Sequence, residues 1–314
     1  MGAVSLTRVL AALAGGTGAA RFLSGVLDVL SPADVVAVVN TGDDVVLHGL
    51  HISPDLDTVL YTLAGAVNSD TGWGLAGESW TAMEALERYG GLTWFRLGDR
   101  DLATHLYRTQ RLRDGMSLSQ VTAEMARAWG VEARLLPMSD DPVETRVDVV
   151  GEGEVGFQEY FVRRRHAVVA SGVRFEGAEQ ARPAPGVLEA LATASTIVIC
   201  PSNPILSIAP ILAVPGIREA VTARRRDTVA VSPIVAGAAL KGPADRLLTE
   251  LGHEASVVGV SRLYAPLAAT LVVDEADAAL AHDVEAEGMR CIVTGTVMHG
   301  RGEAASLAQT VLSA

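Results

Sequence analysis

The chain has 314 residues, a net charge of −12 and 49% hydrophobic residues. That composition is typical of a globular protein with a sizeable core, not of a disordered one. The negative charge argues against non-specific binding to nucleic acid or to an anionic membrane. No apolar run has the length of a membrane span, and we expect no signal peptide. With two cysteines only, Cys200 and Cys291, we expect a cytoplasmic protein with reduced thiols.

Short apolar runs alternate with helix-like segments along most of the chain, which predicts an α/β fold with a mostly parallel, Rossmann-like sheet. The runs are rich in Val and Ile and do not alternate with polar residues, as expected for strands buried on both faces. The predicted strands cover residues 8–13, 35–39, 196–200, 228–231, 256–260, 270–273 and 290–293. The predicted helices cover residues 19–30, 56–66, 185–192, 243–251, 275–286 and 303–313.

The middle of the chain has a different pattern. Helical periodicity dominates its first half, where Ser117 is a plausible N-cap. Strand-like residues 146–150 and 157–163 follow, and the glycines between them predict a β-hairpin. The helices predicted here cover residues 77–89, 101–108 and 117–129. We therefore predict a core formed by residues 1–67 and 183–314, with residues 68–182 inserted as an α+β subdomain.

The first predicted strand ends in a glycine-rich turn that opens onto a helix. The turn is formed by Gly15, Gly16, Thr17 and Gly18. Backbone N–H groups at such a helix start can approach a phosphate closely, so we predict phosphate binding; a plain strand-to-helix turn is the alternative. The turn lacks the lysine of a P-loop, and Arg21 replaces the third glycine of a dinucleotide fingerprint. Since Lys241 is the only lysine of the chain, anion binding should depend mainly on backbone amides, arginine and metal ions.

Two acidic loops follow the turn closely. Residues 40–44, NTGDD, close the second predicted strand, and residues 53–58, SPDLDT, begin the next helix. Asp at a helix start is favoured by the helix dipole, yet four carboxylates exceed what capping requires. Mg²⁺ takes one or two carboxylates together with substrate phosphates, so the loops predict a Mg²⁺ site beside the turn. Ordinary polar loops are the alternative, and the nearby His48 and His51 are more often structural.

Further polar loops follow other strands of the predicted sheet. Residues 201–204, PSNP, come directly after a strand, and residues 137–142, PMSDDP, repeat the pattern. The segment FRLGDRD, residues 95–101, gathers charges around one glycine. Because the carboxyl ends of parallel strands meet at one edge of a sheet, we expect several of these loops to line a common pocket. The sequence contains no nucleophile elbow, zinc motif or Cys-x-x-Cys pair.

Taken together, these motifs resemble the 2-phospho-L-lactate transferase family of deazaflavin coenzyme F-420 biosynthesis, called CofD in archaea and FbiA in actinobacteria. The resemblance covers nearly the whole chain and is most specific in SPDLDT, LGDRD and PMSDDP. The Ala- and Arg-rich, Lys-poor composition is similar to that of the actinobacterial type. The resemblance implies a homodimer with a Rossmann-like core, a requirement for Mg²⁺, and an insertion, residues 68–182, that completes the deazaflavin site.

The resemblance also implies the reaction. The acceptor would be the deazariboflavin Fo, and the donor a guanosine diphosphate that carries an enolpyruvyl or a lactyl group. The terminal ribityl hydroxyl would attack the phosphorus nearer the organic acid, and GMP would leave. An actinobacterial enzyme is expected to use the enolpyruvyl donor, although no residue of the sequence distinguishes the two donors.

The site residues are assigned on the same basis. By the family pattern Asp57 and Arg96 match positions that contact Fo, although relatives may carry Lys in place of Arg96. The residues predicted to bind Fo are Asp57, Arg96, His48 and Asp99. Those predicted to bind the nucleotide are Gly15, Gly16, Thr17, Gly18, Ser202 and Asn203. We predict Asp44 and Asp57 as catalytic residues and metal ligands. The alternatives are an NAD(P)-dependent oxidoreductase and a non-catalytic nucleotide-binding regulator.

Overall fold

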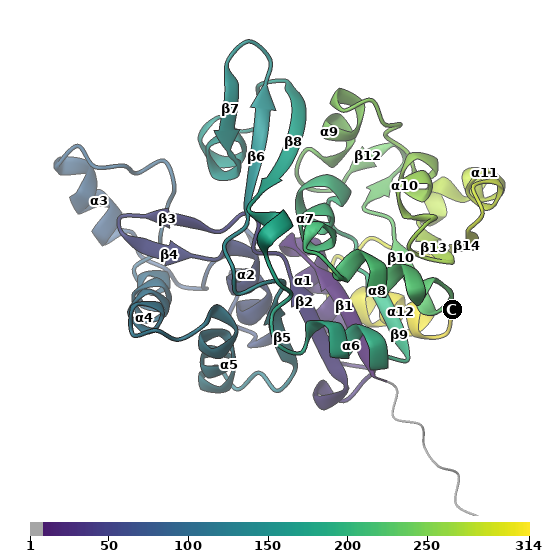
Figure 1. Ribbon diagram of the computed structural model, residues 1–314, viewed down its shortest axis with the longest axis horizontal. Helices are drawn as coiled ribbons and strands as arrows, with labels where there is room; N and C mark the ends of the chain where they lie inside the picture. Colours follow the sequence, from purple (N-terminus) through teal and green to yellow (C-terminus); the bar gives the residue numbers. More distant parts are fainter. Residues whose placement is uncertain (1–8) are drawn as a thin grey trace, which may run out of the picture.

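The structure is a computed structural model that describes residues 9–314, and its centre is a seven-stranded parallel sheet (Figure 1). The strands lie in the order β14-β13-β10-β9-β1-β2-β5, so the α/β class with a parallel sheet is confirmed. The strands are β1 (Leu10–Ala14), β2 (Val35–Val39), β5 (Arg134–Pro137), β9 (Thr196–Ile199), β10 (Thr228–Val231), β13 (Thr270–Val273) and β14 (Arg290–Val293). Arg8, the first residue of the first predicted strand, lies outside the described residues.

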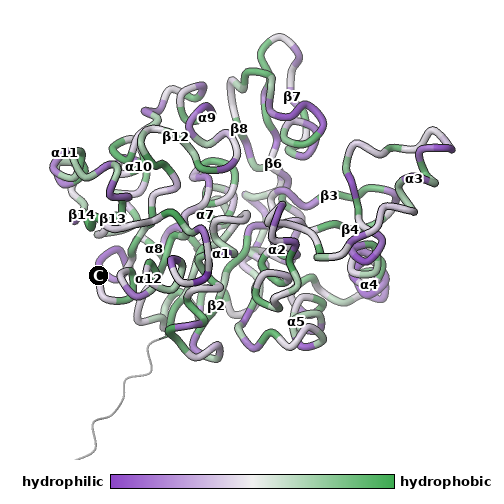
Figure 2. Tube along the Cα trace, turned by 180° about the vertical axis from the view of Figure 1, so that it is seen from behind, coloured by the Kyte–Doolittle hydropathy of each residue, from purple (hydrophilic) through white to green (hydrophobic). Residues whose placement is uncertain are grey.

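Helices cover both faces of this sheet because successive side chains of each strand point to opposite sides. In β1, Ala11 and Leu13 pack on one face, whereas Leu10, Ala12 and Ala14 pack on the other. The first face carries α6 (Val187–Thr193), α7 (Ala209–Ala213), α8 (Ile217–Ala223), α10 (Val257–Tyr264) and α11 (Ala281–Ala286). The second carries α1 (Gly16–Val26), α2 (Pro54–Leu63), α5 (Leu118–Ala128) and α12 (Arg301–Leu312). Figure 2 shows hydrophobic segments gathered around the sheet, whereas α4 is mainly hydrophilic.

The remaining elements surround the sheet. A hairpin and two helices project to one side in Figure 1, and a small antiparallel sheet, β7-β6-β8, stands above the main one. The projection comprises β3 (Val45–Leu47), β4 (Leu50–Ile52), α3 (Thr81–Arg88) and α4 (Asp101–Arg113). The small sheet comprises β6 (Glu144–Val149), β7 (Gly153–Gly156) and β8 (Ala170–Glu176). The other elements are β11 (Ile234–Val235), β12 (Ala238–Ala239), α9 (Ala244–Glu250), π-helical η2 (Glu159–Arg163) and η4 (Pro204–Ile208), and 3₁₀-helical η1 (Pro32–Asp34), η3 (Ala178–Gln180), η5 (Arg225–Asp227) and η6 (Glu275–Leu280).

The prediction of a strand at residues 256–260 was wrong, because this segment begins helix α10. Ser256 caps the helix: its Oγ accepts hydrogen bonds from the N–H groups of Val258 and Gly259. A short run that is apolar on every side carries no periodicity, so the sequence does not separate a buried strand from a buried helix. The predicted N-cap at Ser117 is confirmed, since Ser117 and Gln120 form a reciprocal capping box at α5.

The predicted hairpin was also wrong in its second strand. Residues 159–163 form the π-helical turn η2, and the partners of β6 are β7 and β8. Phe157 and Phe161 are four residues apart, a helical spacing, and their rings stack with centroids 5.2 Å apart. The predicted insertion, residues 68–182, also contributes β5 to the main sheet, where β5 pairs in parallel with β2.

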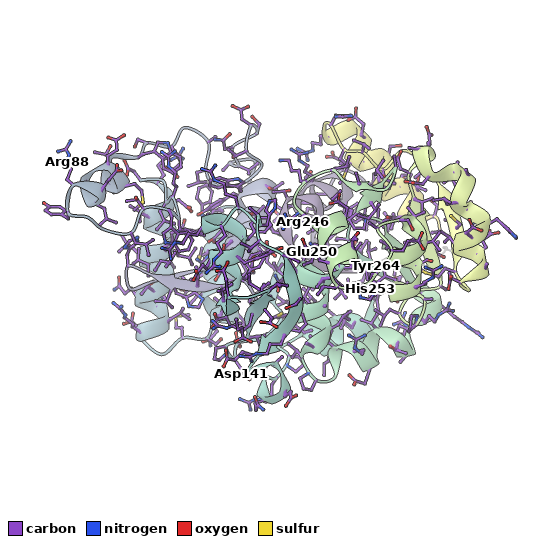
Figure 3. The ribbon with its side chains drawn as sticks, turned by 90° about the horizontal axis from the view of Figure 1, so that it is seen from above. Arg88, Asp141, Arg246, Glu250, His253 and Tyr264 are labelled. Atoms are coloured by element: carbon purple, nitrogen blue, oxygen red, sulfur yellow. The ribbon has the colours of Figure 1, made fainter. Side chains whose placement is uncertain are left out.

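The small sheet is fastened to α9 by hydrogen bonds. Glu250 accepts a hydrogen bond from the N–H of Ala170 on β8, 2.8 Å away. Arg246 donates to the hydroxyl of Tyr160 at 3.2 Å and pairs with Glu250 at 2.9 Å; these two α9 side chains lie close together in Figure 3. The contacts hold η2 at a fixed place above the carboxyl edge of the main sheet.

Between residues 9 and 314, no single helix is long and apolar enough to span a membrane. One strongly bent pair, Pro204–Ala213 with Ile217–Ala223, has the length and composition only when its two parts are taken together. Cys200 is buried and Cys291 half-buried, and neither forms a disulfide in this part of the chain.

The contact between α1 and α12 depends on a glycine. A Cβ on Gly25 would lie 2.2 Å from the backbone carbon of Ala304, a separation that real atoms do not adopt. We therefore expect Gly25→Ala to lower the free energy of unfolding by about 1–3 kcal/mol, despite the better helix propensity of Ala. Gly302 on α12 faces open space, so Gly302→Ala should be neutral or stabilising by up to about 1 kcal/mol. Urea unfolding of both variants measures the difference, and equal stabilities would contradict the contact.

Candidate functional site

A cavity of about 560 Å³ lies at the carboxyl edge of the main sheet. Strands β1 and β9 are neighbours there; the chain continues from β1 towards β5 on one side and from β9 towards β14 on the other. This reversal is a topological switch point, where open α/β sheets bind their ligands. The loops that follow β1, β2, β9, β10 and β14 all contribute to the wall of the cavity.

The glycine turn and the loop after β9 pack directly on each other at this point. A Cβ on Gly18 would lie 2.2 Å from the carbonyl oxygen of Pro201, so only glycine fits. The hydroxyl of Ser202 donates a hydrogen bond to the carbonyl of Gly15 at 2.8 Å. All six residues predicted to bind the nucleotide therefore line one cavity.

The structure also shows how the side chains of this loop are used. Ser202 is buried and bonded to the glycine turn, and Asn203 accepts hydrogen bonds from the N–H groups of Ile205 and Leu206. Asn203 therefore caps the π-helical turn η4. Helix α1 has no side-chain cap, and the N–H groups of its first turn have no intrahelical partners, which makes that helix start the better place for an anion.

Two buried carboxylates share one amide group beside the turn. Asn40, at the end of β2, donates from Nδ2 to Asp43 Oδ1 at 3.1 Å and to Asp55 Oδ2 at 3.0 Å. Gly16 donates its N–H to Asp55 Oδ1 at 2.8 Å. Burial and the neighbouring charge of Asp55 raise the pKa of Asp43 well above its ordinary value. Burial raises the pKa of Asp55 to about 6. Both carboxylates line the cavity.

Asp44, a predicted metal ligand, lies behind this pair. Its Oδ2 accepts a hydrogen bond from the Ser53 hydroxyl at 2.6 Å and lies 3.0 Å from His51 Nε2, whereas its Oδ1 is buried without a hydrogen-bond partner in the described chain. Burial raises the pKa of Asp44. Among residues 9–314, no group of three or more His, Cys, Asp and Glu side chains is arranged to hold a metal. A metal here would need ligands from the substrate as well.

Asp57, the other predicted ligand, lines the cavity but is paired with a buried arginine. Arg108 on α4 is 1% exposed and donates to both carboxylate oxygens of Asp57, from Nη1 at 3.1 Å and from Nη2. His105 lies beside the pair, with Nδ1 3.7 Å from Asp57 and Nε2 3.2 Å from Asp101. Tyr61 donates its hydroxyl to Asp101 at 2.6 Å. The sequence carries no local signal for Arg108, which lies 51 residues from Asp57.

The residues predicted to bind Fo fall into two groups. Asp57 and Arg96 both line the cavity, and the guanidinium of Arg96 lies 4.1 Å from the ring centre of Trp80. Asp99 and His48 lie outside its lining. Asp99 accepts hydrogen bonds from Ser79 and from the first N–H groups of α3, which lower its pKa to about 2. His48 is exposed in the β3–β4 turn with a φ of 54°.

Several residues of the cavity were not assigned to the site from the sequence. Its aromatic wall includes Trp73, Phe95, Phe157 and Phe161. Two cations, Arg21 and Lys241, lie near the glycine turn. Arg21 occupies the position at which a dinucleotide fingerprint has its third glycine. This mismatch was the one feature of the sequence that could have pointed to Arg21 as a residue of the site.

The fold and the switch-point cavity are those of an α/β enzyme that binds its ligands at the carboxyl edge of a doubly wound sheet. A family model described as 2-phospho-L-lactate transferase CofD matches residues 10–300. The chain is 49% identical over 310 residues to a phosphoenolpyruvate transferase of Kitasatospora aureofaciens, covering 97% of each chain. It is 48% identical over 305 residues to a phosphoenolpyruvate transferase of Streptomyces griseus, covering 96% of each.

The chain therefore belongs to the 2-phospho-L-lactate transferase family of coenzyme F-420 biosynthesis, and it is a transferase. The resemblance seen in the sequence, including that to the actinobacterial type, is confirmed. A solved structure of a UPF0052-family protein from Bacillus halodurans has the same fold, with a TM-score of 0.63 at 18% identity over 98% of this chain and 99% of that one.

The pair of Asp57 and Arg108 should be important for stability. Asp57→Asn leaves the guanidinium buried without its counter-charge, so we expect a loss of about 3–5 kcal/mol in the free energy of unfolding. Glu124→Gln is the matched control, because Glu124 pairs with Arg111 near the surface, where loss of an ion pair costs about 1 kcal/mol or less. Denaturant unfolding at neutral pH compares the two, and similar small losses would contradict a buried pair.

Proposed function

We propose that this transferase moves a phosphoenolpyruvyl group from a guanosine diphosphate donor to the terminal ribityl hydroxyl of the deazariboflavin Fo, releasing GMP, and that it requires Mg²⁺. The choice of the phosphoenolpyruvyl group over the 2-phospholactyl group follows the names of the relatives in Kitasatospora and Streptomyces. We also expect a cytoplasmic homodimer, as the family resemblance implies.

The observation that carries the proposal is the meeting of three features at one switch point. The start of α1 has no side-chain cap and only the N–H of Gly16 is bonded to Asp55, so its other N–H groups suit a phosphate. The adjoining carboxylates of Asp43 and Asp55 suit a divalent cation. The aromatic side chains of the lining suit a planar ring system. A diphosphate linked to an organic acid and a deazaflavin together present these groups.

The carboxylates fit Mg²⁺ on physical grounds. Burial raises the pKa of both Asp43 and Asp55, the charge of Asp55 adds to the effect on Asp43, and the charge of Asp44 adds to the effect on Asp55. The two carboxylates share a single uncharged amide, so they lack a positive partner. Mg²⁺ takes one or two carboxylates and completes its shell with water and phosphate oxygens, which agrees with a site that has fewer than three acidic ligands. We therefore assign Asp43 and Asp55 to the metal ahead of Asp44 and Asp57, because Asp57 is already neutralised by Arg108. Bound Mg²⁺ would neutralise charge on the diphosphate.

The protein groups position the reactants. Asp57, fixed by Arg108, accepts a hydrogen bond from the ribityl hydroxyl and orients its oxygen towards the phosphorus nearer the organic acid. A bond forms between these two atoms as the bond to the bridging oxygen breaks, so GMP keeps that oxygen and the hydroxyl proton passes to water. Phosphoryl transfer of this kind depends mainly on position and charge neutralisation, and needs no protein nucleophile.

Release of GMP tests the reaction. Purified protein with Fo, Mg²⁺ and the enolpyruvyl guanosine diphosphate should yield GMP and a phosphodiester of Fo in equal amounts, followed by chromatography. Chelation of Mg²⁺ should stop both. The lactyl donor in a parallel reaction determines the preferred group. Nucleotide binding without GMP release would favour a non-catalytic regulator, and oxidation of NADPH would favour an oxidoreductase.

The metal assignment predicts a pH dependence. Asp55 has a folded pKa of about 6, above its ordinary value of 3.8, so the stability it contributes at low pH is lost as the pH rises through about 6. Mg²⁺ replaces the proton, so its stabilising shift in Tm should be larger at about pH 7.5 than at about pH 5.

Asp55→Asn provides the control for this measurement. Without Mg²⁺, the Tm of the variant should change less between about pH 5 and about pH 7.5 than that of the wild type, because the ionisable carboxyl group is removed. The variant should also lose most of the Mg²⁺-dependent shift. A variant that keeps the full shift would show that Mg²⁺ binds elsewhere.

A further inference from the structure

Two cations lie together at the cavity beside the start of α1. The Nζ of Lys241 and an Nη of Arg21 are 3.1 and 3.6 Å from the point that a Cβ on Gly72 would occupy, and Thr17 Cγ2 is also 3.6 Å from it. Arg21 lies one helical turn after Thr17, and long helical side chains point back towards the N-terminus. Both cations line the cavity together with Thr17.

Neither cation has an acidic partner in the described chain. Lys241 donates from Nζ to the carbonyl of Thr71 at 3.1 Å, and Arg21 donates to the carbonyl of Met298 at 3.4 Å. Desolvation and the charge of Arg21 both lower the pKa of Lys241. Many other arginines between residues 9 and 314 do have a carboxylate partner, for example Arg146 with Glu144 and Arg164 with Glu159. Two like charges therefore lie close together at the cavity, and neither is within ion-pair distance of a carboxylate of the described chain.

Such a pair is unfavourable unless an anion joins it. Like charges at short range repel, and each also loses hydration in a cleft. The neighbouring helix start adds N–H donors of the same polarity. Gly72, with a φ of 75°, brings backbone close to both cations at a position where a side chain would be strained. Lys241 is moreover the only lysine in the chain, so its presence in this cavity is not explained by a generally lysine-rich surface.

We propose that Arg21 and Lys241, with the start of α1, form an oxyanion site for the donor, which binds either its phosphate nearer the organic acid or the carboxylate of the transferred group. The inference rests on the proposed function, because it takes the donor to be a nucleoside diphosphate ester of a hydroxy or enol acid. Lys241 comes from the segment after β12 and Arg21 from α1, so donor binding also joins these two parts of the cavity wall.

The test uses four variants of the full chain. Arg21→Met, Lys241→Met and their combination remove the charges, and Lys241→Arg keeps the charge. Arg226→Met is the matched control, since Arg226 is an exposed arginine outside the cavity lining. Calorimetry with Mg²⁺ measures the binding of GDP, GMP and phosphoenolpyruvate, and steady-state kinetics measures KM for the donor. Melting temperatures close to that of the wild type establish that each variant is folded.

The two sources of the anion give different results. If the pair binds the second phosphate, the Met variants should bind GDP about tenfold or more weakly, while GMP is unaffected. If it binds the carboxylate, phosphoenolpyruvate binding and the donor KM should change by a similar factor while GDP binding is retained. In either case Arg226→Met should remain near the wild type, and Lys241→Arg, which keeps the charge, should lose less affinity than Lys241→Met.

Unchanged binding of all three probes and an unchanged KM in the double variant would overturn the oxyanion site. This outcome differs from failure of the proposed function. If the wild type releases GMP and the variants behave like it, only the oxyanion site is contradicted. If the variants bind GDP or phosphoenolpyruvate more weakly than the wild type, but the wild type releases no GMP with Fo, the oxyanion site is supported and the proposed reaction is contradicted. If the wild type binds none of the probes and releases no GMP, both the oxyanion site and the proposed reaction are contradicted.

Discussion

The burial of Asp43 and Asp55 on one amide is the constraint on which the rest of the site depends. Asn40 binds both carboxylates, and Asp55 in turn binds the N–H of Gly16, so the ends of β2, α2 and α1 are joined through three side-chain contacts. Burial raises the pKa of both acids, and the hydrogen bond from the uncharged amide only partly offsets this effect at Asp55. The arrangement is stable only within a protein that holds these loops firmly.

The main sheet holds these loops in place. β1 and β9 are adjacent, and the loops that follow them meet so closely that Gly18 contacts the carbonyl of Pro201. The core on both faces of the sheet fixes these strand ends, while α9 and η2 close the cavity from above through Arg246 and Glu250. The acidic side of the cavity, with Asp43 and Asp55, and its cationic side, with Arg21 and Lys241, are thus held by the same sheet, and the start of α1 lies between them. That separation suits a substrate that carries a metal-bound phosphate and a further negative group.

The start of α1 in this chain differs from a dinucleotide fingerprint in its charge. In that fingerprint the third glycine allows helix and strand to pack closely, whereas here the same place carries Arg21, whose side chain lies at the cavity. The carboxylate of Asp57 lies next to the acidic cluster, and its charge is neutralised by the buried guanidinium of Arg108. Asp57 can thus accept a hydrogen bond without adding net charge to a region that already holds Asp43, Asp44 and Asp55.

The sequence by itself determined the α/β class, most strands of the sheet, the glycine turn and the acidic loops, because these depend on local patterns of apolar residues, glycine and helix starts. Local patterns failed where no periodicity exists, as at residues 256–260, and where a helical turn contains strand-forming residues, as at Phe157 and Phe161. Only the tertiary structure decided which carboxylates have a cationic partner and which do not. Asp57 and Arg108 are 51 residues apart, and Arg21 lies in α1 whereas Lys241 lies in the segment after β12. Contacts of this range follow from the strand order, on which a single sequence gives no local information.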